Sequence, residues 1–490
     1  MQVKDKIAGE SVELIQDSGN VNVTNSTTVE AEHHPKLSLF QTCSIVISSV
    51  GGVGVFVAMS TIMMTTGSVG VMLIIVLISG LLNYSLAKCF AEVAIILPKA
   101  GGPYFFLLDV FGELPAFLFL WGFVFMIIAP VWAYLAYASA LYIVQLFFPG
   151  CRPPDIATKL LGACILVSVV LINCLYLKFV TKIQALLTST KLVASVFIVI
   201  CGIISAAQGN TENYIDIFEG STTQPGDIAV SILSGMFLYG GWQLITFLLE
   251  EMESPEKNLP KTLSISFAIV ITFSELIVAS YFVLISPTEM IDADAVAVLF
   301  MERIYPAFGP VIAVFVTSTA ISSLNAVILG QSRMVSAAAR RHHLPAILAT
   351  LSEKYTMPWA ATILLCIIAL LILFFGKLSR LIIMMSFYAT VMGLSVLLCF
   401  FALRIKRPNV RRPLKVWLGT AVVQLVICAT TLIMSVYQQP EDIGTLVLFV
   451  LCGIPVYVLF IKWNSKPKII DSTVDKVTIF LQKLLILKHA

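Results

Sequence analysis

Charged residues are scarce in this chain. Only 12% of its 490 residues are Asp, Glu, Lys or Arg, while 58% are hydrophobic and the mean hydropathy is +0.95. A soluble protein of this size needs many more charges on its surface, so that class is excluded. The composition predicts an all-α polytopic membrane protein in a lipid bilayer, because a helix satisfies its backbone polar groups internally. The net charge of +3 does not suggest a nucleic acid as partner.

Common enzyme signatures are also missing. The chain contains no phosphate-cradling GxxxxGK[ST], no HExxH and no GxSxG. We therefore predict that the protein is not an enzyme, and we expect no cofactor and no metal site. Transport would then be driven by gradients of substrate or of ions.

We expect no cleavable signal peptide from the first residues. Residues 1–36 are polar and mixed in charge, without a basic segment followed by an apolar one, and are predicted to be disordered and cytosolic. At the other end, Ser472 to Asp475 resembles a capping box, and apolar residues then recur at helical spacing. Residues 463–490 are therefore predicted to be a cytosolic tail with an amphipathic helix, with a frayed tail as the alternative.

Long apolar runs fill the rest of the chain. About 20 apolar residues in a helix cross a hydrocarbon core of roughly 30 Å. Twelve such runs predict twelve transmembrane helices, at residues 38–61, 68–96, 114–147, 158–178, 187–208, 227–249, 263–286, 307–336, 358–376, 381–403, 416–437 and 443–462. The third run is overlong, which indicates either a strong tilt or an extra interfacial piece, with breaks at Gly112 and Pro115.

Lys and Arg are distributed unevenly between the loops. If the N-terminus is inside, most of them fall on the cytosolic side, including the cluster Arg404, Lys406, Arg407, Arg411, Arg412 and Lys415. The predicted outer loop 209–226 has no Lys or Arg, and the clearest exceptions are Lys377 and Arg380 outside. The positive-inside rule therefore places both termini in the cytosol.

Two of the apolar runs are interrupted by glycines. These are Gly51, Gly52 and Gly54 in the first run and Gly235, Gly240 and Gly241 in the sixth. Glycine weakens a helix, and a broken helix exposes N–H and C=O groups that lipid cannot satisfy. Two interrupted spans in matching positions are typical of a transporter's substrate site. The alternative is that the glycines only allow close packing between helices.

The two interruptions offer opposite polarities to a ligand. A half-helix that starts near Gly54 directs free N–H groups and a positive dipole end at the gap, which suits an α-carboxylate. The carbonyls of Ser48, Ser49 and Val50, with those of Phe237 to Tyr239, suit an α-ammonium group. Together they predict a site for a zwitterion.

Side chains near the interruptions suggest further contacts. Phe237 offers an aromatic ring to close over a ligand, with Trp242 and the amide of Gln243 beside it, although packing is the alternative for each. Lys191 lies in the fifth run, where an ammonium is costly and needs polar partners. It is predicted to stand in for a coupling cation, unless its side chain extends to the inner face instead.

Three residues outside the interruptions also suggest roles. Glu92 and Arg333, near the cytosolic ends of their runs, are candidates for an inner-gate ion pair or for anchoring residues 101–103, with simple interfacial placement as the alternative. Nine of the ten cysteines lie within or beside apolar runs, and only Cys151 lies in a polar loop. An unpaired outer cysteine favours an intermolecular disulfide.

Several motifs resemble those of a known family. The most specific are Phe237-Leu-Tyr-Gly-Gly-Trp-Gln243 and Glu250-Glu-Met-Glu-Ser-Pro-Glu-Lys-Asn-Leu-Pro260. Weaker ones are Thr66-Gly-Ser-Val-Gly70, Phe147-Phe-Pro-Gly-Cys151, Ser332-Arg333 with His343-Leu-Pro345, and Arg412-Pro-Leu-Lys-Val416. With these motifs, residues 38–468 resemble the light subunits of the heteromeric amino-acid transporters, in the L-type and cystine-type branch of the amino acid, polyamine and organocation superfamily.

The resemblance implies a fold and an activity. The fold is leucine-transporter-like (LeuT-like), with two inverted five-helix repeats and two added helices. The activity is obligatory exchange of amino acids without sodium, by alternating access in the plasma membrane. The implied parts are a first repeat at 37–208, a second repeat with outer loops at 209–403, and the last two helices with a basic inner loop at 404–462.

The resemblance also implies roles for individual residues. Gly52-Val53-Gly54 matches the carboxylate-binding turn, and Phe237 matches the occluding aromatic. Lys191 matches the residue at a sodium site of related carriers, and Cys151 matches the cysteine that pairs with a single-pass glycoprotein heavy chain. The complete predicted substrate-binding set is Ser49, Val50, Gly52, Val53, Gly54, Phe237, Gly240, Trp242, Gln243 and Ala389.

Three positions depart from the family's pattern. Val53 stands where Ser is usual, Gln243 where Asn is usual, and Ala389 where a polar residue is frequent. Val53 leaves only backbone donors for the carboxylate, and Ala389 lacks a side chain that helps to select substrates. Because the named positions include no carboxylate or arginine, we predict exchange of neutral amino acids, including large or aromatic ones. Exchange of cationic or acidic amino acids or cystine, and an amino-acid sensor with little transport, are the alternatives.

Overall fold

We describe the fold from a computed structural model. The structure describes residues 36–50, 54, 59–99, 101–148, 153–175, 177–293, 296–352, 357–376, 378–438, 440–462 and 487–488. Several predictions lie outside these residues. They are the segment 1–36 apart from Lys36, the amphipathic helix within 463–490, the turn residues Gly52 and Val53, and the tether Cys151.

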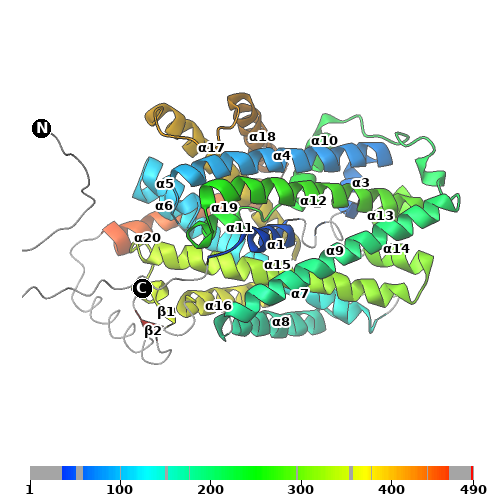
Figure 1. Ribbon diagram of the computed structural model, residues 1–490, viewed down its shortest axis with the longest axis horizontal. Helices are drawn as coiled ribbons and strands as arrows, with labels where there is room; N and C mark the ends of the chain where they lie inside the picture. The colour runs from blue at the N-terminus through cyan, green and yellow to red at the C-terminus, as the bar shows by residue number, and fades with distance from the viewer. Residues whose placement is uncertain are drawn as a thin grey trace, which may run out of the picture. The chain divides into compact units, whose positions relative to one another are not determined.

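The first part of the chain forms helices that Figure 1 draws in blue to green. In chain order they are α1 (Leu39–Ser49), α3 (Met59–Thr66), α4 (Val69–Ile96), α5 (Pro103–Phe111), α6 (Glu113–Phe123), the π-helical segment η1 (Val124–Ile128), α7 (Ala129–Gln145), α8 (Asp155–Leu175) and α9 (Leu177–Ala207). Ser38 begins α1 with a capping box, because its backbone N–H donates to Gln41 Oε1 at 2.9 Å while its hydroxyl accepts from the Gln41 N–H.

The middle of the chain begins with the short helix η2 (Glu212–Tyr214). It continues with α10 (Pro225–Leu238), α11 (Leu244–Phe247), η3 (Leu249–Glu251), α12 (Pro255–Leu284), α13 (Pro287–Asp292), α14 (Val296–Ile304) and α15 (Phe308–Ala339). Proline occupies the first position of α10, α12 and α13, where its missing N–H costs nothing.

The last part contains η4 (Ala346–Ala349), α16 (Trp359–Phe375), α17 (Leu378–Lys406), α18 (Leu418–Gln438), α19 (Pro440–Leu451), α20 (Gly453–Tyr457) and η5 (Val458–Lys462). The described strands are β1 (Leu351–Ser352) and β2 (Leu487–Lys488), which pair antiparallel with Leu351 opposite Lys488.

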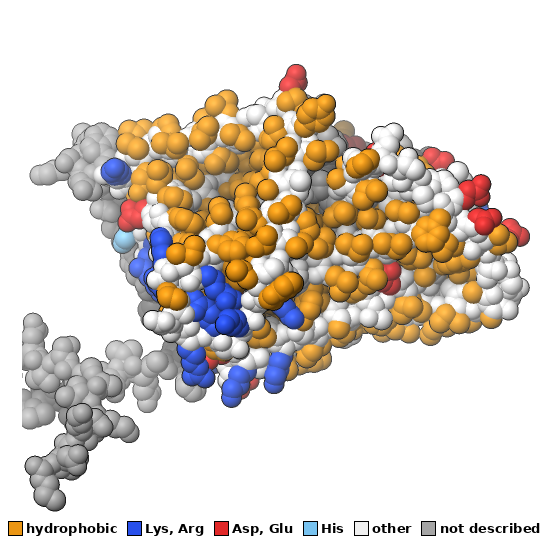
Figure 2. Space-filling view, turned by 90° about the horizontal axis from the view of Figure 1, so that it is seen from above, with side chains coloured by type: hydrophobic (Ala, Val, Ile, Leu, Met, Phe, Trp, Pro, Cys, Tyr) orange, Lys and Arg blue, Asp and Glu red, His pale blue; other side chains and the backbone are white. Residues whose placement is uncertain are grey.

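Among the described residues, nine helices are long and apolar enough to cross a membrane. They span 69–96, 113–145, 155–175, 183–207, 255–284, 308–339, 384–406, 418–437 and 440–462, and three shorter apolar helices are α1, α10 and α16. Each overlaps one predicted run, which confirms a polytopic membrane protein that is helical apart from the short β1–β2 pair. Hydrophobic side chains cover the face in Figure 2, with a group of Lys and Arg at one end and a group of Asp and Glu at the other.

The overlong third run is one continuous span of 33 residues, Glu113–Gln145, and a separate helix precedes it. Gly112, with φ of +91°, ends α5 and precedes α6, so α5 is a separate helix. Pro115 lies in the first turn of α6 and does not interrupt it, because that turn does not need its N–H. The break that was predicted at two positions therefore occurs at Gly112 alone.

Helix α15 lies at the centre of the bundle. Of its most apolar 18-residue window, 72% is buried, compared with 17% for α18. It packs against α1, α7, α8 and α9, and α1 lies between α12 and α15 (Figure 1). A helix that is buried over most of its surface must pair its polar groups with its neighbours, and α15 does so toward α1.

Candidate functional site

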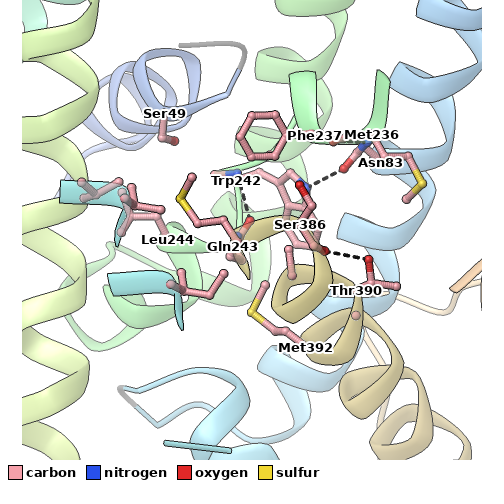
Figure 3. Close-up of a pocket in the computed structure, with 18 of the residues that line it drawn as sticks. Ser49, Asn83, Met236, Phe237, Trp242, Gln243, Leu244, Ser386, Thr390 and Met392 are labelled. Carbon is pink, nitrogen blue, oxygen red and sulfur yellow. Dashed lines mark hydrogen bonds between the residues drawn. The ribbon is translucent and has the colours of Figure 1, made fainter. Parts of the chain in front are cut away.

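A cavity of about 200 Å³ lies beside the interrupted sixth run (Figure 3). Its lining comes from the ends of α1 and α10, from α4, from the α6 to α7 segment, and from α15, α17 and α18. Among the described lining residues none is Asp, Glu, Lys, Arg or His. The cavity therefore suits a ligand whose charges are met by main-chain dipoles and neutral polar groups.

The sixth run is broken at the predicted place. Helix α10 ends at Leu238, the chain turns through residues 239–243, and α11 begins at Leu244. Gly241 has a φ of +103°, and a Cβ there would lie 2.6 Å from the Ser49 carbonyl oxygen. Glycine is thus required because the turn closely approaches the end of α1. The carbonyls of Tyr239 and Gly240 accept no hydrogen bond from the described residues.

The predicted glycines of this run have different roles. Gly240 lines the cavity. Gly235 instead lies inside α10, and a Cβ there would collide with the Ser79 side chain of α4. Gly235 therefore serves close helix packing, which was the alternative reading, and the interruption belongs to Gly240 and Gly241.

Helix α1 ends at Ser49, and Val50 is already extended with ψ of 132°. Its last carbonyls therefore lack partners within the helix. Lys191 Nζ of α9 donates to the oxygens of Ile47 and Val50, both at 2.8 Å, and Ser323 Oγ of α15 donates to the Ser48 oxygen at 2.8 Å. Ammonium and hydroxyl groups thus complete the end of this helix.

Lys191 is buried, with 6% of its surface exposed. No carboxylate among the described residues forms an ion pair with it, and its ammonium group donates its hydrogen bonds to α1 carbonyls. Its side chain therefore does not extend to the inner face. A fixed positive charge at the negative end of a helix dipole is favourable, and a bound cation at this position would make the same interaction.

A buried chain of polar side chains supports the same end of α1. Asn173 of α8 donates to Asn325 of α15 at 2.7 Å, and Asn325 donates to Gln184 of α9 at 2.6 Å. Gln184 donates to the Ser322 hydroxyl at 3.2 Å, which bonds to the Ser48 hydroxyl at 2.8 Å. We call these five residues the amide chain. It fixes α1 relative to three other helices.

Phe237, Trp242 and Gln243 lie beside the break, and their surroundings differ. Phe237 lines the cavity with its ring beside Trp242 in Figure 3. Trp242 is 3% exposed, donates from Nε1 to Asn83 Oδ1 at 3.3 Å, and packs edge-on against Phe90. Gln243 accepts from the Gly241 N–H at 3.1 Å. Trp242 and Gln243 therefore shape the turn as well as line the cavity.

Two walls of the cavity differ in character. The α1 wall consists of Ser49, Gly54 and Ser323, and it is backed by Lys191 and the amide chain. The α17 wall is formed by Met385, Ser386, Ala389, Thr390 and Gly393 with Cys428 and Thr431 of α18. On the α17 wall, the Thr390 hydroxyl donates to the Ser386 carbonyl of its own helix at 2.9 Å (Figure 3).

Most of the described predicted residues meet at this cavity. Those that line it are Ser49, Gly54, Phe237, Gly240, Trp242, Gln243 and Ala389. Val50 contributes its carbonyl to Lys191 instead. Asn83, Ser323 and Gln331 also line it, although they were not predicted. Each is a polar side chain within an apolar helix, and that pattern in the sequence marks a residue as a functional candidate.

Glu92 and Arg333 do not pair with each other. The Glu92 carboxylate is 1% exposed and accepts from Arg404 at 2.7 Å, with Arg412 at 3.5 Å. Arg333 pairs with Glu251. The candidate ion pair between them does not form, because α4 packs against α17 near Glu92 and Arg333 of α15 pairs with Glu251 in the segment after α11.

Comparisons with known proteins agree with the motifs. A family model described as amino acid permease matches residues 37–461. The cystine/glutamate transporter of Homo sapiens is 33% identical over 451 residues, which cover 92% of this chain and 90% of that protein. The large neutral amino acids transporter small subunit 2 of Oryctolagus cuniculus is 31% identical over 465 residues, covering 93% and 85%.

A third relative, the Asc-type amino acid transporter 1 of Mus musculus, is 31% identical over 458 residues, which cover 92% of this chain and 85% of that protein. These similarities extend across the whole helical part of the chain. They confirm the resemblance to the light subunits of heteromeric amino-acid transporters.

Proposed function

The chain belongs to the amino acid permease family, and on that premise we propose that it is a sodium-independent exchanger of neutral amino acids. Such a protein is a transporter and not an enzyme. The observation that carries the proposal is the cavity, where main-chain groups from two interrupted helices meet and no described lining residue is charged. A zwitterion needs both polarities at its head group and no net charge around its side chain.

The proposed fold is LeuT-like, with twelve spans arranged as two inverted five-helix repeats and two further helices. The end of α1 and the break after α10 are separated by four long apolar helices, and they meet at one cavity. Interrupted first and sixth spans are expected where each begins a repeat. Exchange then proceeds by alternating access as one group of helices moves against the other.

Lys191 is proposed to replace a coupling cation. Its ammonium already occupies the place next to the Ile47 and Val50 carbonyls, so no sodium ion is needed to complete the end of α1. The charge is covalently attached and cannot be transported. Coupling to sodium is therefore not available at this position, which supports exchange as the mode of transport.

The proposed partner is a single-pass glycoprotein heavy chain linked through Cys151. The proposed location is the plasma membrane, with both termini in the cytosol, on the basis of the uneven distribution of Lys and Arg. Co-expression with candidate heavy chains should give a high-mass band on non-reducing gels that Cys151→Ser removes. A band that persists in the variant would exclude Cys151 as the tether.

Exchange of acidic amino acids or cystine is the second candidate, because one relative is named a cystine/glutamate transporter. The uncharged cavity argues against it. Vesicles loaded with labelled leucine should release label when leucine or another neutral amino acid is added outside. Stronger release by glutamate, cystine or lysine would favour the second candidate or a cationic substrate.

The decisive measurement is efflux from proteoliposomes. Labelled amino acid trapped inside should leave only when external amino acid is present, with and without sodium. Gly54→Val should stop exchange, because a Cβ at Gly54 would already lie 3.0 Å from Leu238 Cδ1. Gly444→Val is the matched control, since nothing lies within 4 Å of a Cβ at Gly444. Saturable binding without any efflux would instead identify a sensor.

A further inference from the structure

In the described part of the chain, the long apolar helices contain two carboxylate side chains that lie more than one turn inside both helix ends. They are Glu92 of α4 and Glu275 of α12. Glu92 is neutralised by Arg404 and Arg412 and also accepts from the Val416 N–H at 2.7 Å. Glu275 has no such arrangement. An ionisable group inside a membrane is costly and is by default a functional candidate, so the difference needs a physical explanation.

Glu275 has a buried carboxylate oxygen, Oε1, without a hydrogen-bond partner. The hydroxyl of Tyr239 is also buried, and it lies beside Ser274, the residue that precedes Glu275 in α12. A Cβ at Gly80 of α4 would lie 2.8 Å from Ile271 and 3.0 Å from the Tyr239 ring carbon that bears the hydroxyl. Because Ile271 and Glu275 are four residues apart on one face of α12, the carboxyl group lies one turn from this contact.

Tyr239 connects the surroundings of Glu275 to the proposed substrate site. It is the residue at which α10 ends, so it is the first residue of the break that contains Gly240 and Gly241. The packing of Tyr239 between Gly80 and Ile271 holds the end of α10 against α4 and α12. A change of charge next to Tyr239 therefore acts on the position of the break.

Other titratable groups on the elements around α12 are engaged elsewhere. Lys88 of α4 lies over the Tyr84 ring two turns beyond Gly80, and Lys191 of α9 donates to α1. Tyr214 of η2 donates to the Ala279 carbonyl, and Arg303 of α14 pairs with Glu289 of α13. Cys43 of α1 lies near Ser266, more than two turns from Glu275. Tyr239 lies close enough to Glu275 for the two groups to interact electrostatically.

We propose that Glu275 is a proton-binding site that couples the break in the sixth span to pH. In the packed arrangement, its carboxyl group holds a proton, because an unpaired carboxylate between apolar helices is unfavourable. When the helices separate during transport and water enters, the proton passes to water and the group ionises. Only an O–H bond is broken and formed, and bulk water supplies and receives the proton.

The first test measures the proton directly. Infrared difference spectra of the purified full chain in lipid should show a carboxylic acid C=O band that is lost as the pH is raised from about 5 to 9, a range that covers buried glutamates. Glu275→Gln should lack this band. Ser264→Ala is the control, because Ser264 lies on the same helix as Glu275 and its hydroxyl bonds to Tyr84 of α4. This variant should retain the band. Identical spectra for wild type and Glu275→Gln would overturn the proposal.

The second test measures the coupling, and it rests on the proposed function. The exchange rate of wild type and Ser264→Ala should vary severalfold over the same pH range. Glu275→Gln should exchange at a rate that does not change with pH and equals the wild-type rate at the acid end, because glutamine resembles the neutral acid. A wild-type pH profile in Glu275→Gln would overturn the coupling. Absence of exchange in all three proteins would overturn the proposed function, while the infrared result still decides proton binding.

Discussion

The α1 wall and the α17 wall of the cavity meet the same ligand space with different chemistry. Behind the α1 wall, Lys191 and Ser323 donate hydrogen bonds to the last carbonyls of α1, and the amide chain joins α1 to three helices. The α17 wall combines apolar side chains with the hydroxyls of Ser386, Thr390 and Thr431, and the Thr390 hydroxyl bonds within its own helix. The comparison suggests that the head group common to all amino acids is bound at the rigid wall and the variable side chain at the plain one.

The largest expected effect is at Lys191. Lys191→Met keeps the unbranched length but leaves two buried carbonyls without a donor, and each costs about 1–3 kcal/mol. We expect exchange to fall by more than tenfold and the melting temperature of the detergent-solubilised protein to drop. Lys159→Met is the control, since Lys159 pairs with Asp155, whose side chain is 60% exposed, and such pairs are worth about 0–1 kcal/mol. Equal exchange rates and melting temperatures for the two variants would show that Lys191 does not hold the α1 wall in place.

The next effect is at the turn that touches the α1 wall. Gly241→Ala places a side chain where φ is +103° and 2.6 Å from the Ser49 oxygen, with a backbone cost of about 1–3 kcal/mol. Exchange should fall about tenfold. Gly226→Ala, in the first turn of α10 with open space around its Cβ, should exchange like wild type. Full activity in Gly241→Ala would show that the turn can move away from α1 without harm.

A smaller and selective effect is expected on the α17 wall. Ala389→Leu fills part of the space proposed for the substrate side chain, and overpacking costs about 1–3 kcal/mol. Exchange of phenylalanine should weaken about tenfold while exchange of alanine changes little. The measurement is the apparent KM for both substrates in the same vesicles. Equal losses for the two would mean that this wall also contacts the head group.

The smallest changes in exchange rate are expected when one hydroxyl is removed from each wall. Ser323→Ala removes the donor to the Ser48 carbonyl, and an interhelical hydrogen bond in a membrane averages about 0.6 kcal/mol, or roughly a threefold change in exchange. Thr390→Val should change exchange less, because that hydroxyl is already bonded within α17. A larger loss at Thr390 would reverse the assignment of the two walls.

Much of the fold followed from patterns that are local along the chain. Apolar runs of the right length overlap every long apolar helix described, and the glycine pair at Gly240 and Gly241 marked the break in the sixth span. Ion pairs between distant parts of the chain did not follow from such local patterns. An ion pair between Glu92 and Arg333 was one of the options, but Glu92 pairs with Arg404 and Arg412 from the last part of the chain.

The sequence by itself determined the membrane class, the family and the interrupted helices, because hydrophobic length, motifs and glycine flexibility depend only on neighbours in the chain. The tertiary structure decided that Gly235 packs against Ser79 and does not interrupt its helix, and that Lys191 turns to α1 and not to the inner face. It also decided that a carboxylate oxygen of Glu275 is buried near Tyr239 without a hydrogen-bond partner. These outcomes depend on which helix faces which, and the free energy of a buried polar group is set by that neighbour.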